Sequence, residues 1–163
     1  MNQRLFAASA CLSDEALNAD RQAFFKSVMG TLNHVMVGDI IWLKRFAVQP
    51  SSQISLSYIT ELEKPGSLEV ILFNNLDRLT VAREKIDEII IRWIDGLSET
   101  DLTECLAYKN MAGKLFKKPY ASLISHLFMH QIHHRGQATT LLSQLCVDFG
   151  DTDLVKIISE CVS

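Results

Sequence analysis

The sequence predicts an all-α protein: a four-helix bundle of the up-and-down type with a small β-hairpin inserted before the last long helix. One long segment is apolar on most sides and a second has apolar residues at helical spacing, and both exceed the roughly ten residues that strands reach. Proline and glycine are scarce, with 3 and 7 residues in a chain of 163, which disfavours a fold of many short strands and turns. We expect a single helical-bundle domain over residues 1–163.

The first half of the chain contains the predicted central helix. A first helix is expected over residues 2–11, and Ser13, followed by two acidic residues, is a capping signal for a short helical turn. The apolar residues of segment 23–46 predict a long buried helix. Residues 47–66 include Pro50 and Pro65, and they predict an irregular connection with about one turn of helix.

The second half predicts two further long helices separated by the hairpin. Residues 67–94 have helical apolar spacing that ends near Gly96. Residues 102–118 alternate around an Asn/Gly turn, which is typical of a β-hairpin. Pro119 can open the next helix, expected from Tyr120 to about Leu145, and residues 152–160 predict a short terminal helix.

Charge and hydropathy exclude several classes of partner. The net charge is −3 at pH 7, whereas a protein that grips a phosphate backbone needs a basic face. The one basic cluster, Lys114, Lys117 and Lys118, is interpreted as a solvated loop, so no nucleic-acid partner is expected. No window reaches the roughly 18 apolar residues of a membrane span, and the N-terminus is too short and polar for a signal peptide.

Cysteine placement predicts a cytoplasmic protein with reduced thiols. The four cysteines lie far apart and form no CxxC pair; they are Cys11, Cys105, Cys146 and Cys161. Without an export signal, reduced thiols in the cytoplasm are the default. We expect each cysteine to be buried and structural rather than part of a disulfide or a zinc cluster.

Four of the five histidines lie within nine residues of the last long helix. A helix turns about 100° per residue, so these side chains share an arc of roughly 100°. Relative to the apolar face of that helix, His134 points inward, His130 lies beside the face, His126 is at its margin and His133 points outward. A pair four residues apart on an inward face can chelate one metal ion, which selects His130 and His134.

Two histidines require a third ligand from another helix. His34, in the middle of the central helix, is the natural candidate, and Asp39 is another oxygen ligand or a supporting partner. Three neutral imidazoles leave one coordination position for water or substrate, and zinc and nickel both suit them. The alternative is that the histidines are structural, although burial without partners would leave ring nitrogens unsatisfied.

Two histidine-bearing motifs closely resemble a known family. The run HLFMHQIHHRGQATTLLSQL at residues 126–145 resembles the signature of the DinB-like (DNA-damage-inducible) family. The segment from Thr31 to His34, followed by Asp39, residues 41–43 and residues 45–46, is similar to that family's second signature. Residues 2–6 and 23–25 resemble its N-terminal pattern, although Met1 stands where the family's first helix is already under way.

The resemblance implies a four-helix bundle that forms a homodimer and binds a divalent metal through His34, His130 and His134. His126 is then an outer supporting residue or an alternative ligand. The all-round apolar character of the predicted central helix also favours a homodimer.

Relatives with this bundle are metal-dependent thiol transferases, so the resemblance implies a stress-response enzyme that activates a thiol or water against a small electrophile. Arg135 could hold an anionic substrate, and Asp39 could act as a general base or orient a ligand histidine. The alternative is a non-enzymatic stress-response protein with a structural or sensing metal, which a fourth protein ligand such as His126 would indicate.

Overall fold

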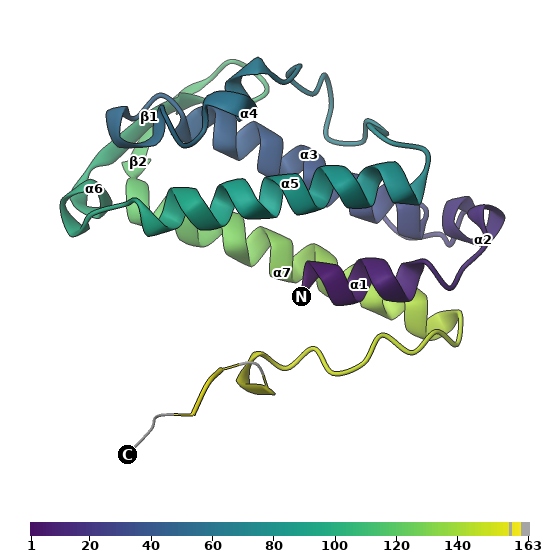
Figure 1. Ribbon diagram of the computed structural model, residues 1–163. Coiled ribbons are helices and arrows are strands. Elements are labelled where there is room, and N and C mark those ends of the chain that lie inside the picture. Colours follow the sequence, from purple (N-terminus) through teal and green to yellow (C-terminus); the bar gives the residue numbers. More distant parts are fainter. Residues whose placement is uncertain (157, 161–163) are drawn as a thin grey trace.

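The computed structural model describes residues 1–156 and 158–160, and it shows four bundle helices with a small hairpin near one end (Figure 1). The predicted all-α bundle with a hairpin insertion is confirmed. The bundle helices are α1 (Asn2–Ser9), α3 (Val28–Phe46), α5 (Leu76–Asp95) and α7 (Tyr120–Gln144). The shorter elements are α2 (Asp14–Asn18), η1 (Pro50–Ser52), α4 (Ser57–Glu61), α6 (Glu99–Thr103) and η2 (Leu154–Lys156).

Helix α3 begins at Val28, later than the sequence pattern indicated. Ser27 is its N-cap, and the Ser27 hydroxyl accepts a hydrogen bond from the backbone N–H of Gly30. Lys26 has a φ of 65°, so the chain turns immediately before the helix. The two phenylalanines assigned to the helix therefore diverge: Phe24 is 78% exposed, whereas the Phe25 ring stacks on His34.

A long connection carries the chain from the end of α3 to the start of α5, so that these two helices run in the same direction (Figure 1). Helix α5 begins at Leu76, where the Asn75 side chain caps it by accepting from the N–H of Arg78. The apolar spacing predicted that residues 67–75 belong to this helix, but they form a non-helical segment.

Asn33 of α3 fastens that segment to the bundle. Its Nδ2 donates to the carbonyl of Phe73 at 2.9 Å, and its Oδ1 accepts from the N–H groups of Leu72 and Phe73, each at 2.9 Å. The Asn33 side chain is buried, so these bonds form where water does not compete for them. The connection is thereby held against α3 one residue before His34.

The end of the bundle remote from His34 is closed by aromatic packing. The Phe46 ring stacks on Trp93 with ring centroids 5.0 Å apart. Ser52 Oγ lies 2.7 Å from the Tyr120 hydroxyl and accepts from the indole N–H of Trp93 at 2.8 Å. These contacts join α3, η1, α5 and α7 around groups that are all buried.

The hairpin precedes α7, as predicted. Strands β1 (Cys105–Lys109) and β2 (Leu115–Pro119) pair antiparallel, with Tyr108 opposite Phe116. Pro119 is the N-cap of α7 rather than its first helical residue. In segment 152–160 the described residues contain only the 3₁₀ turn η2, so the predicted terminal helix is wrong there.

The structure also bears on three expectations from the sequence: the burial of the cysteines, the homodimer and the absence of a membrane span. Cys11, Cys105 and Cys146 are free thiols but exposed rather than buried, and Cys161 lies outside the described residues. Most of α3 is buried within one chain, so its apolar character needs no second copy, and the homodimer stays a prediction. Across the described part of the chain, no helix combines the length and hydrophobicity needed to cross a membrane.

Candidate metal centre

Helices α3 and α7 pack antiparallel, and their contacts follow a regular register. The residues in contact advance by four along α3 while they retreat by four along α7, which is the spacing that keeps one face of each helix turned to the other. The facing pairs are His34 with His134, Gly38 with His130, and Trp42 with His126.

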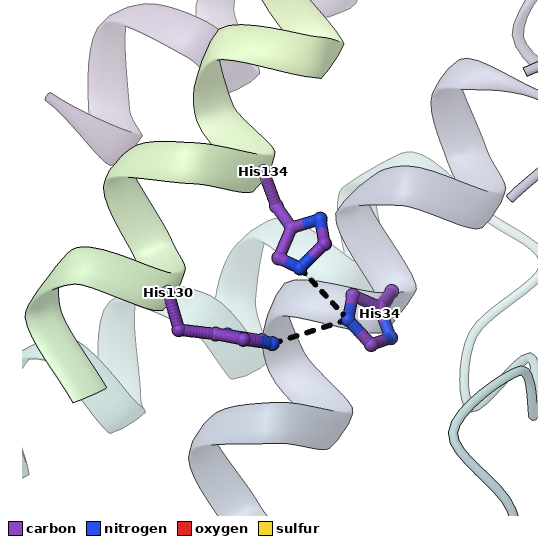
Figure 2. Close-up of side chains that lie close together, drawn as sticks. All are labelled: His34, His130 and His134. Atoms are coloured by element: carbon purple, nitrogen blue, oxygen red, sulfur yellow. Dashed lines mark hydrogen bonds between the residues drawn. The ribbon is translucent and has the colours of Figure 1, made fainter. Parts of the chain in front are cut away.

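The three predicted ligand histidines come together at this interface, with their Nε2 atoms converging (Figure 2). The Nε2 of His34 lies 3.2 Å from that of His130 and 3.1 Å from that of His134. Tetrahedral zinc with nitrogen ligands at about 2.0–2.1 Å places those nitrogens about 3.3 Å apart. The spacing of the Nε2 atoms therefore fits a single small divalent ion.

Hydrogen bonds at the far side of two rings determine which nitrogen carries the proton. The Nδ1 of His34 donates to the backbone carbonyl of Leu68 at 2.8 Å, and the Nδ1 of His134 donates to Gln137 Oε1 at 2.8 Å. In a neutral imidazole the other nitrogen, Nε2, then carries a lone pair. The Nε2 lone pairs of His34 and His134 face each other at 3.1 Å and repel each other. A cation bound between the two nitrogens would accept both lone pairs and remove this repulsion.

Burial keeps these imidazoles in the neutral form that binds metal. It is the largest cause that lowers the pKa of His34 and of His134 below the usual value. For His130, burial and then the neighbouring imidazoles lower the pKa to about 4. A proton therefore competes weakly with a metal ion for this site at neutral pH.

Two glycines of α3 provide the space that the site requires. A Cβ at Gly38 would lie 2.5 Å from the Cε1 atom of the His130 ring, so only glycine lets this ring rest against α3. A Cβ at Gly30 would collide with the backbone carbonyl of Phe25. The close approach at Gly30 positions the Phe25 ring, which stacks on His34 with ring centroids 3.7 Å apart.

The burial of the α7 histidines follows the helical-wheel prediction. His134 is buried, His130 is half-buried, and His126 and His133 are exposed. His126 does not join the cluster, because its ring centroid lies 6.0 Å from that of His130 and it packs edge-on against Trp42. Among the described residues, no fourth histidine, cysteine or carboxylate completes the group.

Asp39 occupies a different environment from the one predicted. It is buried and forms an ion pair with Arg83 of α5, and its Oδ2 accepts from Gln131 Nε2 at 2.8 Å. Burial raises the pKa of the Asp39 carboxyl, and the Arg83 guanidinium opposes that rise. The predicted roles as a metal ligand or as the orienting partner of a ligand histidine do not fit: Asp39 is not in the histidine group, the His34 and His134 rings have other partners, and the His130 Nδ1 has no hydrogen-bond partner among the described residues.

Arg135 is half-buried and belongs to the polar network of Asp39, not to the triad. Its guanidinium donates to Gln131 Oε1 at 3.0 Å and to Asn2 Oδ1 at 3.3 Å. Asn2 in turn donates to Asp87, which also pairs with Arg83 at 2.8 Å. The network therefore links all four bundle helices, and the predicted anion-holding role of Arg135 at the metal has no support in these contacts.

An open cleft of about 570 Å³ lies beside the triad, between α3, α7 and the turn of the hairpin. His34 and His130 form part of its lining, together with the aromatic rings of Phe25 and Trp42. No aspartate or glutamate is among the described residues that line it. A molecule in this cleft can therefore reach the Nε2 cluster without meeting a carboxylate.

Several residues that shape the site could not be identified from the sequence. The Leu68 carbonyl is a backbone group in a segment that was expected to be helical. Gly38 and Phe25 act through close packing between segments far apart in the sequence. Gln137 was the exception, since a side chain three residues after His134 lies on the same helix face and could have been identified by that spacing.

Comparisons with known proteins show which family this chain resembles over nearly its whole length. The sequence profile described as the DinB family matches residues 1–159. The protein named Protein DinB from Bacillus subtilis (strain 168) is 24% identical over 157 residues, which cover 93% of this chain and 84% of that protein. No solved structure gives a significant match.

The close approach at Gly38 predicts a specific metal-binding defect. In Gly38→Ala, the added methyl should displace the His130 ring and weaken zinc affinity by about 10- to 100-fold, the range found when the support of a ligand is lost. Competition with a chromogenic chelator measures this. Gly136→Ala, on an open face of α7, is the matched control and should bind zinc as the wild type does. Equal affinity in all three proteins would show that the ring does not depend on Gly38.

Because His130 is buried in its neutral form, the stability of the metal-free protein should depend on pH. The unfolded imidazole titrates near 6.5 and the folded one near 4, so the unfolded state binds more protons between these values. The free energy of unfolding should therefore fall as the pH drops from about 6.5 to about 4. Urea titrations should show a smaller fall for His130→Gln and an unchanged one for the exposed His133→Gln. An identical pH profile for wild type and His130→Gln would contradict the assignment.

Proposed function

This chain belongs to the DinB family, and on that premise we propose that it is a divalent-metal-dependent enzyme that transfers a small thiol to an electrophilic substrate. The observation that carries the proposal is the convergence of three Nε2 atoms beside an open cleft. His34, His130 and His134 would hold the ion. A divalent cation on neutral imidazoles lowers the pKa of a bound thiol or water, which supplies a nucleophile near neutral pH.

The number of histidines in the cluster supports a catalytic rather than a purely structural site. Structural zinc is closed by four protein ligands, whereas catalytic zinc keeps a position for water or substrate. His126, the residue best placed in sequence to close the site, packs on Trp42 instead. The half-buried His130 ring lines the cleft, so a small molecule has a route to the ligand atoms.

The chemistry of the cleft favours thiol transfer over hydrolysis. A hydrolase that activates water commonly uses a side-chain base within hydrogen-bond reach of the reacting proton. The described lining of the cleft contains no carboxylate, and Asp39 is engaged by Arg83 and Gln131. The lining histidine outside the triad, His126, packs edge-on against Trp42 with ring centroids 5.0 Å apart and 6.0 Å from the His130 ring. Phe25, Ile41 and Met111 make the walls apolar, which suits a soft thiol and an organic electrophile better than bulk water.

The ligand residues have defined tasks in this proposal. The Leu68 carbonyl and the Gln137 amide fix the rings of His34 and His134, so that both present Nε2 without reorganisation. Phe25 covers one face of the His34 ring. These contacts keep the ligand nitrogens aimed at one point and shield the His34 face from water.

Thiol conjugation to a chlorodinitrobenzene tests the proposal directly. Zinc- or nickel-loaded protein should accelerate the reaction of glutathione or mercaptoethanol by about tenfold or more at neutral pH, because the thiolate fraction of a free thiol is only a few per cent there. Chelation of the metal and His130→Ala should each abolish the acceleration. Gly136→Ala, which changes a residue on an open face of α7, should retain it. No acceleration with either metal and any of several thiols would overturn the proposal.

A further inference from the structure

The cleft is lined by a positively charged side chain that is not part of the histidine triad. Arg45 of α3 lines the same cleft as His34 and His130. It follows His34 by about three helical turns, which returns it to the same face of the helix. Helical side chains lean toward the N-terminus of their helix, so the Arg45 guanidinium is directed back along the cleft toward the triad.

The Arg45 guanidinium is held by aromatic rings and not by a carboxylate. Its central carbon lies 4.4 Å from the ring centroid of Trp42 and 5.0 Å from that of Tyr108 in the hairpin. Among the residues that the structure describes, no carboxylate oxygen lies within 4.0 Å of it. Stacking on aromatic rings uses the face of the guanidinium and leaves its N–H edge for a ligand.

The charges around this end of the cleft are positive. Arg45 is half-buried, and burial lowers its pKa, but a guanidinium stays charged at neutral pH. Burial is the largest cause that lowers the pKa of His126, which also lines the cleft, and the positive charges of Arg45 and then Lys118 lower it further. A partly desolvated cation that lacks a protein counter-charge is costly, and an anion from outside the chain would offset that cost.

We propose that Arg45 forms an anion-binding subsite of the cleft, which receives a carboxylate of the ligand whose other end reaches the histidine cluster. The proposal rests on the proposed function, and it specifies the thiol as one that bears a carboxylate at a distance from the sulfur. Trp42 and Tyr108 position the guanidinium, and Arg45 contacts the ligand.

The geometry selects a carboxylate and sets the length of the ligand. A single guanidinium edge matches the two oxygens of a carboxylate, whereas phosphate sites usually add a helix N-terminus or several cations. Arg45 is the one Arg or Lys among the described residues that line this cleft, and Lys118 does not line it. Gly38 marks the level of the His130 ring on α3, and seven residues at about 1.5 Å each separate it from Arg45. This rise is about 10.5 Å, and the guanidinium lies back over Trp42 toward the triad, so the carboxylate and the thiol should lie on the order of 8 to 10 Å apart.

A matched pair of thiols tests the subsite without an activity assay. Cobalt(II)-loaded protein is titrated with mercaptohexanoate and with mercaptohexanol, which differ only at the end remote from the sulfur, and the visible spectrum of cobalt reports thiol binding. Wild type should bind the carboxylate about tenfold more tightly, the effect of one charge-assisted contact. Arg45→Gln should remove this preference and leave mercaptohexanol binding unchanged, and Arg45→Lys should retain part of it.

Lys44→Gln is the matched control, because Lys44 donates to the Thr60 carbonyl and does not line the cleft beside the triad. It should keep the wild-type preference for mercaptohexanoate. Equal binding of the two thiols by wild type, or the same preference in Arg45→Gln, would overturn the subsite. Competition by inorganic phosphate as strong as that by hexanoate would overturn the assignment to a carboxylate.

Failure of the proposed function remains distinguishable from failure of the subsite. If the protein binds no cobalt, or if neither thiol alters the cobalt spectrum, the proposed function fails. Hexanoate is then titrated into metal-free protein while the Arg45 Nε–H signal, assigned by its absence in Arg45→Gln, is followed by NMR. A saturable shift with hexanoate but not with hexanol supports the subsite, and no shift at millimolar hexanoate overturns it.

Discussion

The antiparallel packing of α3 on α7 determines whether the three histidines meet at all. Gly38 lies opposite His130, and the missing side chain lets the imidazole rest directly against the α3 backbone. A slip of one helical turn would place a larger residue under that ring and would separate His34 from His134, which face each other in the present register. The site is thus a consequence of how two helices interlock.

A buried polar network holds the same register from the other side. Asp39 of α3 accepts from Gln131 of α7 and pairs with Arg83 of α5, so the three helices can slide only by breaking bonds to a buried charge. Removing one member of such a network is expensive because the remaining charge loses its partner in a dry environment. This explains why Asp39, whose position near His34 in the sequence suggested chemistry, has a structural role in the fold.

The sequence was sufficient for the features that depend on local periodicity. The wheel of α7 identified His130 and His134 as the inward pair, and the Asn/Gly turn identified the hairpin. It was insufficient where a single residue overrides a pattern: Ser27 caps α3 after Phe25, and Asn75 caps α5 after a long apolar stretch. Tertiary partners such as the Leu68 carbonyl, and the diversion of Asp39 to Arg83, depend on packing between distant segments and leave no periodic trace.

Metal content by elemental mass spectrometry tests the central claim most directly. Wild-type protein purified without chelators should carry about one divalent ion per chain, and His34→Ala, His130→Ala and His134→Ala should each lose it while remaining folded. His126→Ala should keep the ion, because His126 lies outside the cluster. Wild type that folds fully but binds no divalent ion under any loading condition would contradict the account and would leave the three histidines a structural role only.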